Sequence, residues 1–67
     1  MNYFALDKVK LGFGVETRTG DKAKFLTDEL SSGLVAFLVC GRIELYNKDG
    51  TYYNNAGGEH HLDLFMV

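Results

Sequence analysis

The sequence contains no proline and no tryptophan, and it has a single cysteine, Cys40. Proline in a strand restricts that strand to a sheet edge or a bulge, and this sequence carries no such restriction. One cysteine excludes a disulfide within the chain, and no Cys-x-x-Cys motif or Cys/His set points to a metal, so no cofactor is expected. Because Cys40 follows a strongly apolar segment, we expect a buried, unreactive thiol in a reducing cytoplasm.

The sequence also has no large excess of charge of either sign and no long apolar run. The 67 residues include seven basic and nine acidic ones, with a formal net charge of −2 and no basic block. Binding to duplex DNA through phosphate neutralisation, or any sequence-specific nucleic-acid binding, is therefore not expected. No run reaches the ~18 apolar residues of a membrane span, and Asp7, Lys8 and Lys10 interrupt the region where a signal peptide would lie. We expect one complete cytoplasmic domain over residues 1–67, away from membranes.

The longest apolar run, Leu34–Val39, is short and rich in β-branched and aromatic residues. Such a run favours a strand that is buried on both faces. Residues 1–11 space their apolar side chains like one or two helical turns, which Gly12 would end. Because so short a helix is unstable alone, it must dock on the sheet, and Phe4 and Val9 are its expected anchors.

Shorter alternating segments on both sides of this run predict antiparallel strands joined by hairpins. The alternation assigns these inward-facing positions: Val15, Ala23, Phe25, Ile43 and Leu45. It also places Leu62, Leu64 and Met66 on one face of an extended segment, which could pack within the subunit or across a dimer seam. Turns are expected at Thr19–Asp21, Cys40–Arg42 and Asn47–Gly50. A short returning strand is expected at Thr51–Tyr53, followed by a flexible loop over residues 54–59. The apolar C-terminal segment predicts a strand tied into the sheet. The fold class is mainly β: a short N-terminal helix and an antiparallel meander of roughly 5–6 strands, forming a twisted sheet or small open barrel.

Basic and aromatic side chains on these strands are the candidate ligand-binding residues: Arg18, Lys22, Lys24, Arg42, Tyr46 and Tyr52. The cations could form a basic face for a phosphate or an acidic partner. The alternative is an ordinary solvated face paired with Glu16 and Glu44. The tyrosines could stack on a base or anchor an interface, or they could only stabilise strand pairs.

Residues suited to catalysis or metal binding are scarce. His60 and His61 are adjacent, and neighbours on a strand point to opposite faces, so we expect two solvated side chains and no shared metal ion. No acid–base pair, nucleophile elbow or phosphate-binding loop is recognisable. We therefore expect no catalytic residues and no enzymatic activity.

Three segments together resemble a set of very small β-rich proteins encoded by bacteriophages and prophages. Val15 to Ala23 reads Val-x-Thr-Arg-x-Gly-x-Lys-Ala, Tyr46 to Tyr52 reads Tyr-x-x-Asp-Gly-x-Tyr, and Asp63 to Met66 reads Asp-Leu-Phe-Met. The family implies no established activity and supplies no catalytic residues. The layout is also similar to that of phage proteins that bind the signal nucleotide of the Thoeris defence system.

Our hypothesis from the sequence is a non-enzymatic phage protein that counters a host defence in the host cytoplasm by sequestering a nucleotide immune signal. In that role Arg18 and Lys22 would grip phosphates, and Tyr46 or Tyr52 would stack on the base. One alternative is an inhibitor of a host defence protein, comparable to an anti-CRISPR protein, that binds through an exposed strand edge. Another is an accessory interaction module of the virion. Because small folds often need an added source of stability, we expect a homo-oligomer.

Overall fold

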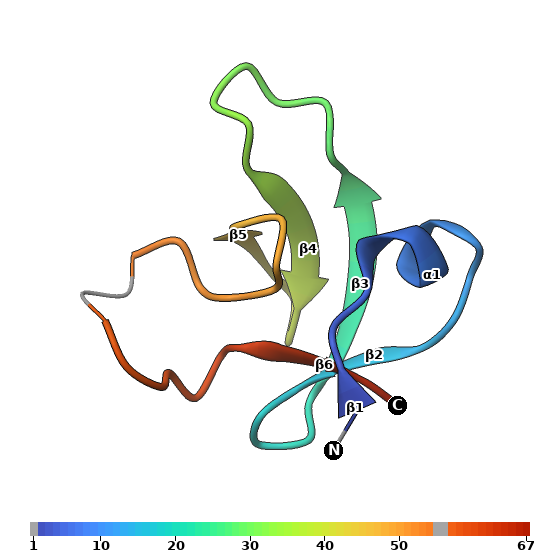
Figure 1. Cartoon of the computed structure of the whole chain (residues 1–67), viewed down its shortest axis with the longest axis vertical. Coiled ribbons are helices and arrows are strands. Elements are labelled where there is room, and N and C mark those ends of the chain that lie inside the picture. The colour runs from blue at the N-terminus through green and yellow to red at the C-terminus, as the bar shows by residue number, and fades with distance from the viewer. Residues whose placement is uncertain (1, 55–56) are drawn as a thin grey trace.

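The structure of the protein is a computed structural model that describes residues 2–54 and 57–67. Within these residues it has one short helix and a six-stranded sheet (Figure 1). In chain order the elements are β1 Asn2–Tyr3, α1 Leu6–Lys10, β2 Val15–Thr17, β3 Lys22–Thr27, β4 Val35–Val39, β5 Arg42–Tyr46 and β6 Leu64–Met66. The mainly β fold class predicted from the sequence is confirmed. Met1 in the expected helical segment and residues 55–56 in the expected flexible loop lie outside the described residues.

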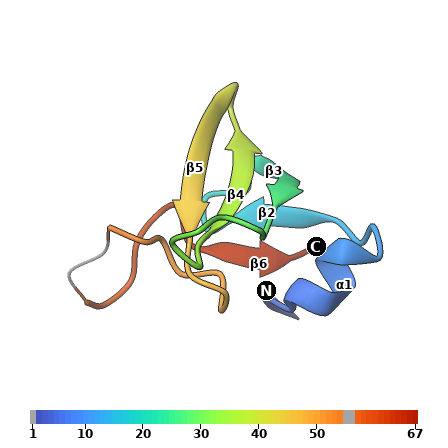
Figure 2. The same cartoon turned by 90° about the horizontal axis from the view of Figure 1, so that it is seen from above.

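The sheet is antiparallel, with the strand order β1-β6-β2-β3-β4-β5. Strands β2 to β5 form the predicted meander, whereas β6 returns from the end of the chain to lie between β1 and β2. Figure 2 shows β4 and β5 standing across the direction of β2 and β6, so the sheet is sharply bent. Its outermost strands, β1 and β5, do not pair with each other, so the sheet is open and not a closed barrel.

The N-terminal helix is shorter than residues 1–11, the segment in which the sequence predicts it. Helix α1 spans five residues, and the chain before it forms β1. The N–H of Gly12 donates to the carbonyl of Val9, which ends the helix where the glycine predicted it. Val9 is buried and Phe4 packs against the core, so both expected anchors are confirmed.

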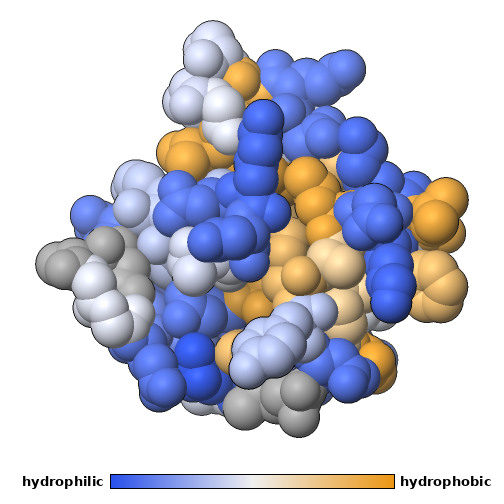
Figure 3. Space-filling view, in the orientation of Figure 1, coloured by the Kyte–Doolittle hydropathy of each residue, from blue (hydrophilic) through white to orange (hydrophobic). Residues whose placement is uncertain are grey.

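Aromatic rings around Phe37 form the middle of the core. Phe37 is fully buried and meets Phe4, Phe25 and Tyr46 edge-on, with ring centroids 6.0, 5.7 and 5.5 Å apart. Edge-to-face pairs add about 0.5–1.5 kcal/mol each beyond the burial of their area. Figure 3 shows apolar atoms in the middle and right of the face seen in Figure 1, bordered by hydrophilic side chains.

The β2–β3 hairpin has the predicted inward face. Val15 is buried, and Ala23 and Phe25 pack against the core. Glu16 lies opposite Lys22 on the other side of the hairpin. Alternation therefore predicts the two faces of this hairpin correctly.

The turn between β4 and β5 consists of Cys40 and Gly41, with φ angles of 50° and 77°. Positive φ at both central residues is the type I′ geometry that suits the twist of a two-residue hairpin. The turn was predicted, but the expectation of a buried thiol is wrong. Cys40 lies at the tip of the hairpin, beyond the sheet, and is exposed.

The two sides of β5 are reversed relative to the prediction. The turn fixes the register so that Arg42 lies opposite Val39, a core residue, which puts Glu44 and Tyr46 on the core side as well. Ile43 is instead 67% exposed on the opposite side of the sheet. Leu45, which was also expected to face inward, shares that opposite side.

The prediction that Leu34–Val39 is buried on both faces is wrong at Leu38. Leu38 lies opposite Ile43, on the side of the strand pair away from the core, and is 36% exposed. Ala36, on the same side, is buried. Both sides of β4 are therefore buried at one end of the strand only.

The C-terminal strand is tied into the sheet, as the sequence predicted. Met66 pairs with Asn2 of β1 and with Val15 of β2. Leu64 and Met66 are buried, and Leu62 packs against the same core.

The strand expected at Thr51–Tyr53 is a single bridge between Tyr46 and Tyr52. The backbone N–H groups of Thr51 and Tyr52 donate to the carboxylates of Asp49 and Asp63. Those donors are therefore not available for a longer strand ladder. The turn predicted just before this segment is present, since the N–H of Gly50 donates to the carbonyl of Asn47.

Candidate functional site

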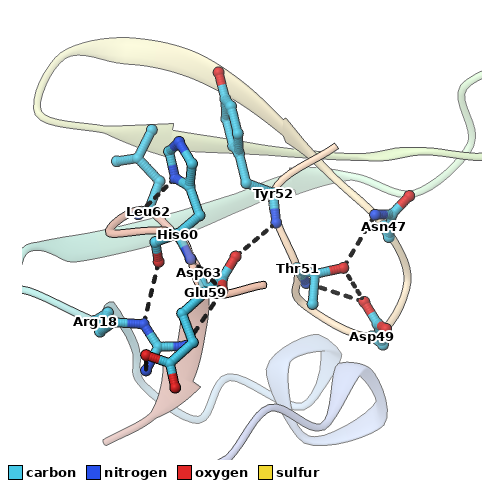
Figure 4. A network of polar contacts seen from close by, with 9 residues as sticks. All are labelled: Arg18, Asn47, Asp49, Thr51, Tyr52, Glu59, His60, Leu62 and Asp63. Atoms are coloured by element: carbon cyan, nitrogen blue, oxygen red, sulfur yellow. Dashed lines mark hydrogen bonds and ion pairs between the residues drawn. The ribbon is translucent and has the colours of Figure 1, made fainter. Parts of the chain in front are cut away.

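Arg18, the first candidate cation, is held by groups of the protein itself (Figure 4). Its Nε donates to the carbonyl oxygen of His60 at 3.2 Å, and its Nη2 donates to Oδ2 of Asp63 at 3.3 Å. Nη1 lies 3.7 Å from a carboxylate oxygen of Glu59, and the guanidinium carbon lies 4.8 Å from the ring centroid of Phe65. The guanidinium therefore already has two anionic partners, which leaves it poorly placed to grip a phosphate.

Asp63 is the centre of this polar network and is buried. Its carboxylate accepts the backbone N–H of Tyr52 at 2.9 Å and of His60 at 3.0 Å, in addition to Arg18. Burial by itself raises the pKa of Asp63, but the two N–H donors and the guanidinium together hold that pKa below its ordinary value. The ionised Asp63, which precedes β6, thus holds together Arg18 at the end of β2, Tyr52 and His60.

A second carboxylate organises the neighbouring turn (Figure 4). Oδ1 of Asp49 accepts the Thr51 hydroxyl at 2.6 Å and the Thr51 backbone N–H at 3.0 Å. The hydroxyl of Thr51 and backbone N–H together lower the pKa of Asp49. Asn47 Nδ2 donates to the same Thr51 hydroxyl at 3.0 Å. These contacts explain why the Asp-Gly turn forms.

Tyr46 does not lie where a ligand could stack on it. The residue is 0% exposed, and its ring meets those of Phe37 and Tyr52 at 5.5 and 5.7 Å. Burial, with the nearby charge of Glu44, raises the pKa of the Tyr46 hydroxyl. That hydroxyl has no hydrogen-bond partner among residues 2–54 and 57–67. The prediction that Tyr46 contributes to a ligand site is therefore wrong, because β5 turns this side into the core.

Tyr52 is already stacked and hydrogen-bonded. Its hydroxyl donates to Oε1 of Glu44 at 3.0 Å, and its ring stacks on that of His60 at 4.6 Å between centroids. The rings of His60 and His61 stack in turn at 4.5 Å, so the two histidines lie on one side and not on opposite faces. The segment is not a strand at this point, which is why the alternation rule failed. In the part of the chain that the structure describes, no group of three His, Cys, Asp or Glu side chains could hold a metal ion.

The four candidate cations do not form one basic face. Lys22 and Lys24 are exposed on one side of β3. Arg42 belongs to the core side of β5, where its side chain is 79% exposed and Nη2 lies 3.5 Å from Oε2 of Glu44. Arg18 lies in the Asp63 network. Only the two lysines are therefore close enough to act together.

These two lysines border a partly apolar surface that the sequence did not reveal. We call it the outer face: Lys22, Lys24 and Leu26 of β3, Ala36 and Leu38 of β4, and Ile43 and Leu45 of β5. Leu26 is 41% exposed, and Leu38 lies between Lys24 and Ile43 in the register. The two-residue turn at Cys40-Gly41 was the sequence feature that could have predicted this face, because it fixes the side of the sheet on which Ile43 lies.

A groove of about 500 Å³ opens between β3 and the segment that joins α1 to β2. Lys10, Lys22, Lys24, Phe13 and Phe25 are among the residues that line it. Phe13 is 60% exposed. The volume falls within the range of ordinary small-ligand sites, about 300–1,000 Å³.

One of the groove lysines has a partner of its own. Lys10 Nζ lies 2.8 Å from Oδ2 of Asp28, and this hydrogen bond raises the pKa of Lys10. Lys22 and Lys24 have no ion-pair partner within residues 2–54 and 57–67, so they carry the unpaired positive charge at the groove.

Comparison with known protein families, curated proteins and solved structures finds no match. Across residues 2–54 and 57–67, α1 is far too short to cross a membrane, and no other helix is present. The proposals below therefore depend on the geometry of this chain and on the resemblance given by its motifs.

Proposed function

We propose that the protein is a non-enzymatic binding module that docks on a partner protein through its outer face. The proposal rests on the exposure of Leu26, Leu38 and Ile43 together on one uncovered side of the sheet. Clustered exposed apolar side chains on a small domain mark interaction surfaces more often than scattered ones do.

The charges next to the apolar cluster define the partner. Lys22 and Lys24 are exposed at the β3 border of the face, beside Leu38. A matching surface therefore has an apolar centre and acidic groups along one side, so that the lysines speed the encounter and set the orientation. An acidic, partly apolar patch on a folded protein satisfies both requirements.

The phage resemblance supplies the biological class of the partner in this proposal. A small phage-encoded binding protein that acts in the host cytoplasm would meet host defence proteins there. Covering an active or assembly surface of such a protein with the outer face would inhibit it without any chemistry. This is the inhibitor class that the sequence left as the alternative to a nucleotide-binding protein, but with the outer face as the binding surface in place of a strand edge.

Leu38→Glu tests the proposal in host cells that express the protein with an affinity tag. A carboxylate at the centre of the outer face should remove a co-purifying host protein, because the charge would be buried against apolar and acidic groups. Leu11→Glu is the matched control, since Leu11 is 79% exposed at the end of α1. Recovery of the same host proteins with Leu38→Glu as with Leu11→Glu would contradict the proposal.

A second candidate function, sequestration of a nucleotide, is favoured by the groove alone. Lys22 and Lys24 offer unpaired cations there, and the exposed Phe13 offers a surface for a base. A nucleotide at 100 times its dissociation constant would add ~2.7 kcal/mol to the free energy of unfolding. A thermal-shift series with cyclic and linear nucleotides tests this: a shift that is lost in Lys22→Glu/Lys24→Glu but kept in Lys48→Glu supports it. The absence of any shift in the wild-type protein contradicts it.

A further inference from the structure

Strand β5 lies at one edge of the sheet, and half of it is uncovered. It pairs with β4 along its length, and on its other side, among residues 2–54 and 57–67, only Tyr52 forms a bridge, at Tyr46. The N–H of Tyr53 donates to the carbonyl of Leu45 at 3.3 Å on that same side. From Arg42 to Glu44, the described residues place no strand next to β5.

The backbone of Ile43 points toward this open side. In a hairpin with a two-residue turn, the flanking residues exchange hydrogen bonds, so Arg42 points its N–H and C=O toward β4. These groups alternate along a strand, so those of Ile43 and Leu45 point away from β4. The Tyr53 hydrogen bond to Leu45 confirms that direction one step further along the strand.

We infer that this edge binds a second copy of the chain, antiparallel, about a two-fold axis at Ile43. Ile43 of each copy then exchanges two N–H···O=C bonds with Ile43 of the other, and the two sheets become continuous. The pairing between the two copies ends at Leu45, because the carbonyl of Leu45 already accepts the N–H of Tyr53. This limits the seam to Arg42–Glu44 and predicts a dimer whose formation depends on concentration.

The charges on the edge are self-complementary in this register. Arg42 of one copy lies opposite Glu44 of the second copy, and Glu44 opposite Arg42 of the second copy. The Tyr52 hydroxyl already holds Oε1 of Glu44. The Arg42 side chain is 79% exposed, and in the dimer it would exchange its 3.5 Å contact with Glu44 of its own chain for Glu44 of the second copy. Shifting the register by two residues would lose both opposite-charge pairs, so the charges favour one alignment.

The apolar side of the same edge is also self-complementary. Ile43 is 67% exposed, and on the outer face it would meet Ile43 of the second copy, with Leu38 behind each. The dimer therefore extends the outer face across the two-fold axis. A strand of an unrelated protein could add to the edge, but it would not need the reciprocal charges.

Charge reversal tests the arrangement by sedimentation velocity over a range of concentrations. Arg42→Glu and Glu44→Arg should each weaken the wild-type dimer by roughly tenfold or more, since like charges then face each other twice. An equal mixture of the two variants should restore dimers, because the mixed pair again places opposite charges together. Lys24→Glu, away from the edge, should behave as wild type.

Each alternative outcome contradicts the inference. A wild-type protein that stays monomeric at the highest concentration reached overturns it, as does a mixture of the variants that stays as monomeric as each alone. If the Arg42→Glu variant dimerises as strongly as the wild type does, another surface forms the dimer.

A covalent probe covers the case in which Glu44→Arg fails to fold. Residues that exchange both hydrogen bonds across antiparallel strands have Cα atoms about 5.5 Å apart, within the range of a disulfide. Ile43→Cys in a Cys40→Ser background should therefore form a disulfide-linked dimer under mild oxidation. Leu26→Cys in the same background is the matched exposed control, and an equal yield of crosslinked dimer from it would overturn the inference.

Discussion

Gly50 lies directly against the side chain of Phe4, so that a Cβ added at residue 50 would come within 2.5 Å of Phe4 Cγ. Gly50 also has a φ of 89°, which disfavours any residue with a Cβ. Gly50→Ala should therefore lower the free energy of unfolding by about 2–4 kcal/mol, from backbone strain and displacement of a core ring.

Gly33→Ala separates these two causes. Gly33 has a φ of 81°, but an added Cβ there would have no neighbour within 4 Å. We expect this control to lose about 1 kcal/mol, the strain alone. Urea denaturation of both variants measures the difference, and equal losses would show that contact with Phe4 plays no part.

The lowered pKa of Asp63 predicts a specific acid sensitivity. A carboxyl with a pKa below its unfolded value contributes stability that is fully present above that unfolded value, about 3.9, and is lost as the pH falls through the folded value. Asp63→Asn should lower the free energy of unfolding by about 1–3 kcal/mol at neutral pH. It should also flatten the dependence of stability on pH below about 4.

Asp7→Asn is the control for this prediction. Asp7 is exposed in the first turn of α1, so its removal should leave most of the acid transition in place. Thermal unfolding from neutral pH to pH ~2 measures both variants. An Asp63→Asn protein with the wild-type pH dependence would contradict the structural role of this carboxylate.

The two packed tyrosines should respond oppositely to loss of their hydroxyl groups. The Tyr46 hydroxyl is buried with no partner among the described residues, so Tyr46→Phe should be neutral or stabilising. Tyr52→Phe should lose about 0.5–1.5 kcal/mol, because its hydroxyl donates to Glu44. Chemical denaturation compares the two, and a larger loss for Tyr46→Phe would show that its hydroxyl has a partner.

Local sequence patterns predicted much of the fold. The apolar strand around Phe37, the Asp49-Gly50 turn and the C-terminal strand all follow from residue type and spacing over a few positions. The two sides of β5 did not follow, because alternation in Arg-Ile-Glu-Leu-Tyr favours burial of Ile43 and Leu45. The register set by the Cys40-Gly41 turn overrides that preference.

The candidate site was harder to predict than the fold. Arg18 looks like a free cation in the sequence, and its partner Asp63 is 45 positions away. No local pattern reveals that these two residues come together in the fold. Lys22 and Lys24 are exposed, as simple alternation with the inward-facing Ala23 and Phe25 predicts.

Photo-crosslinking from position 38 tests the central claim, that the outer face binds a partner protein, most directly. A photoreactive residue replaces Leu38 in one protein and Leu11 in another, and both are irradiated inside host cells. The account predicts one dominant adduct with a host protein from position 38 and none of that size from position 11. Adducts from position 38 that match those from position 11, or that join only two copies of this chain, would contradict it.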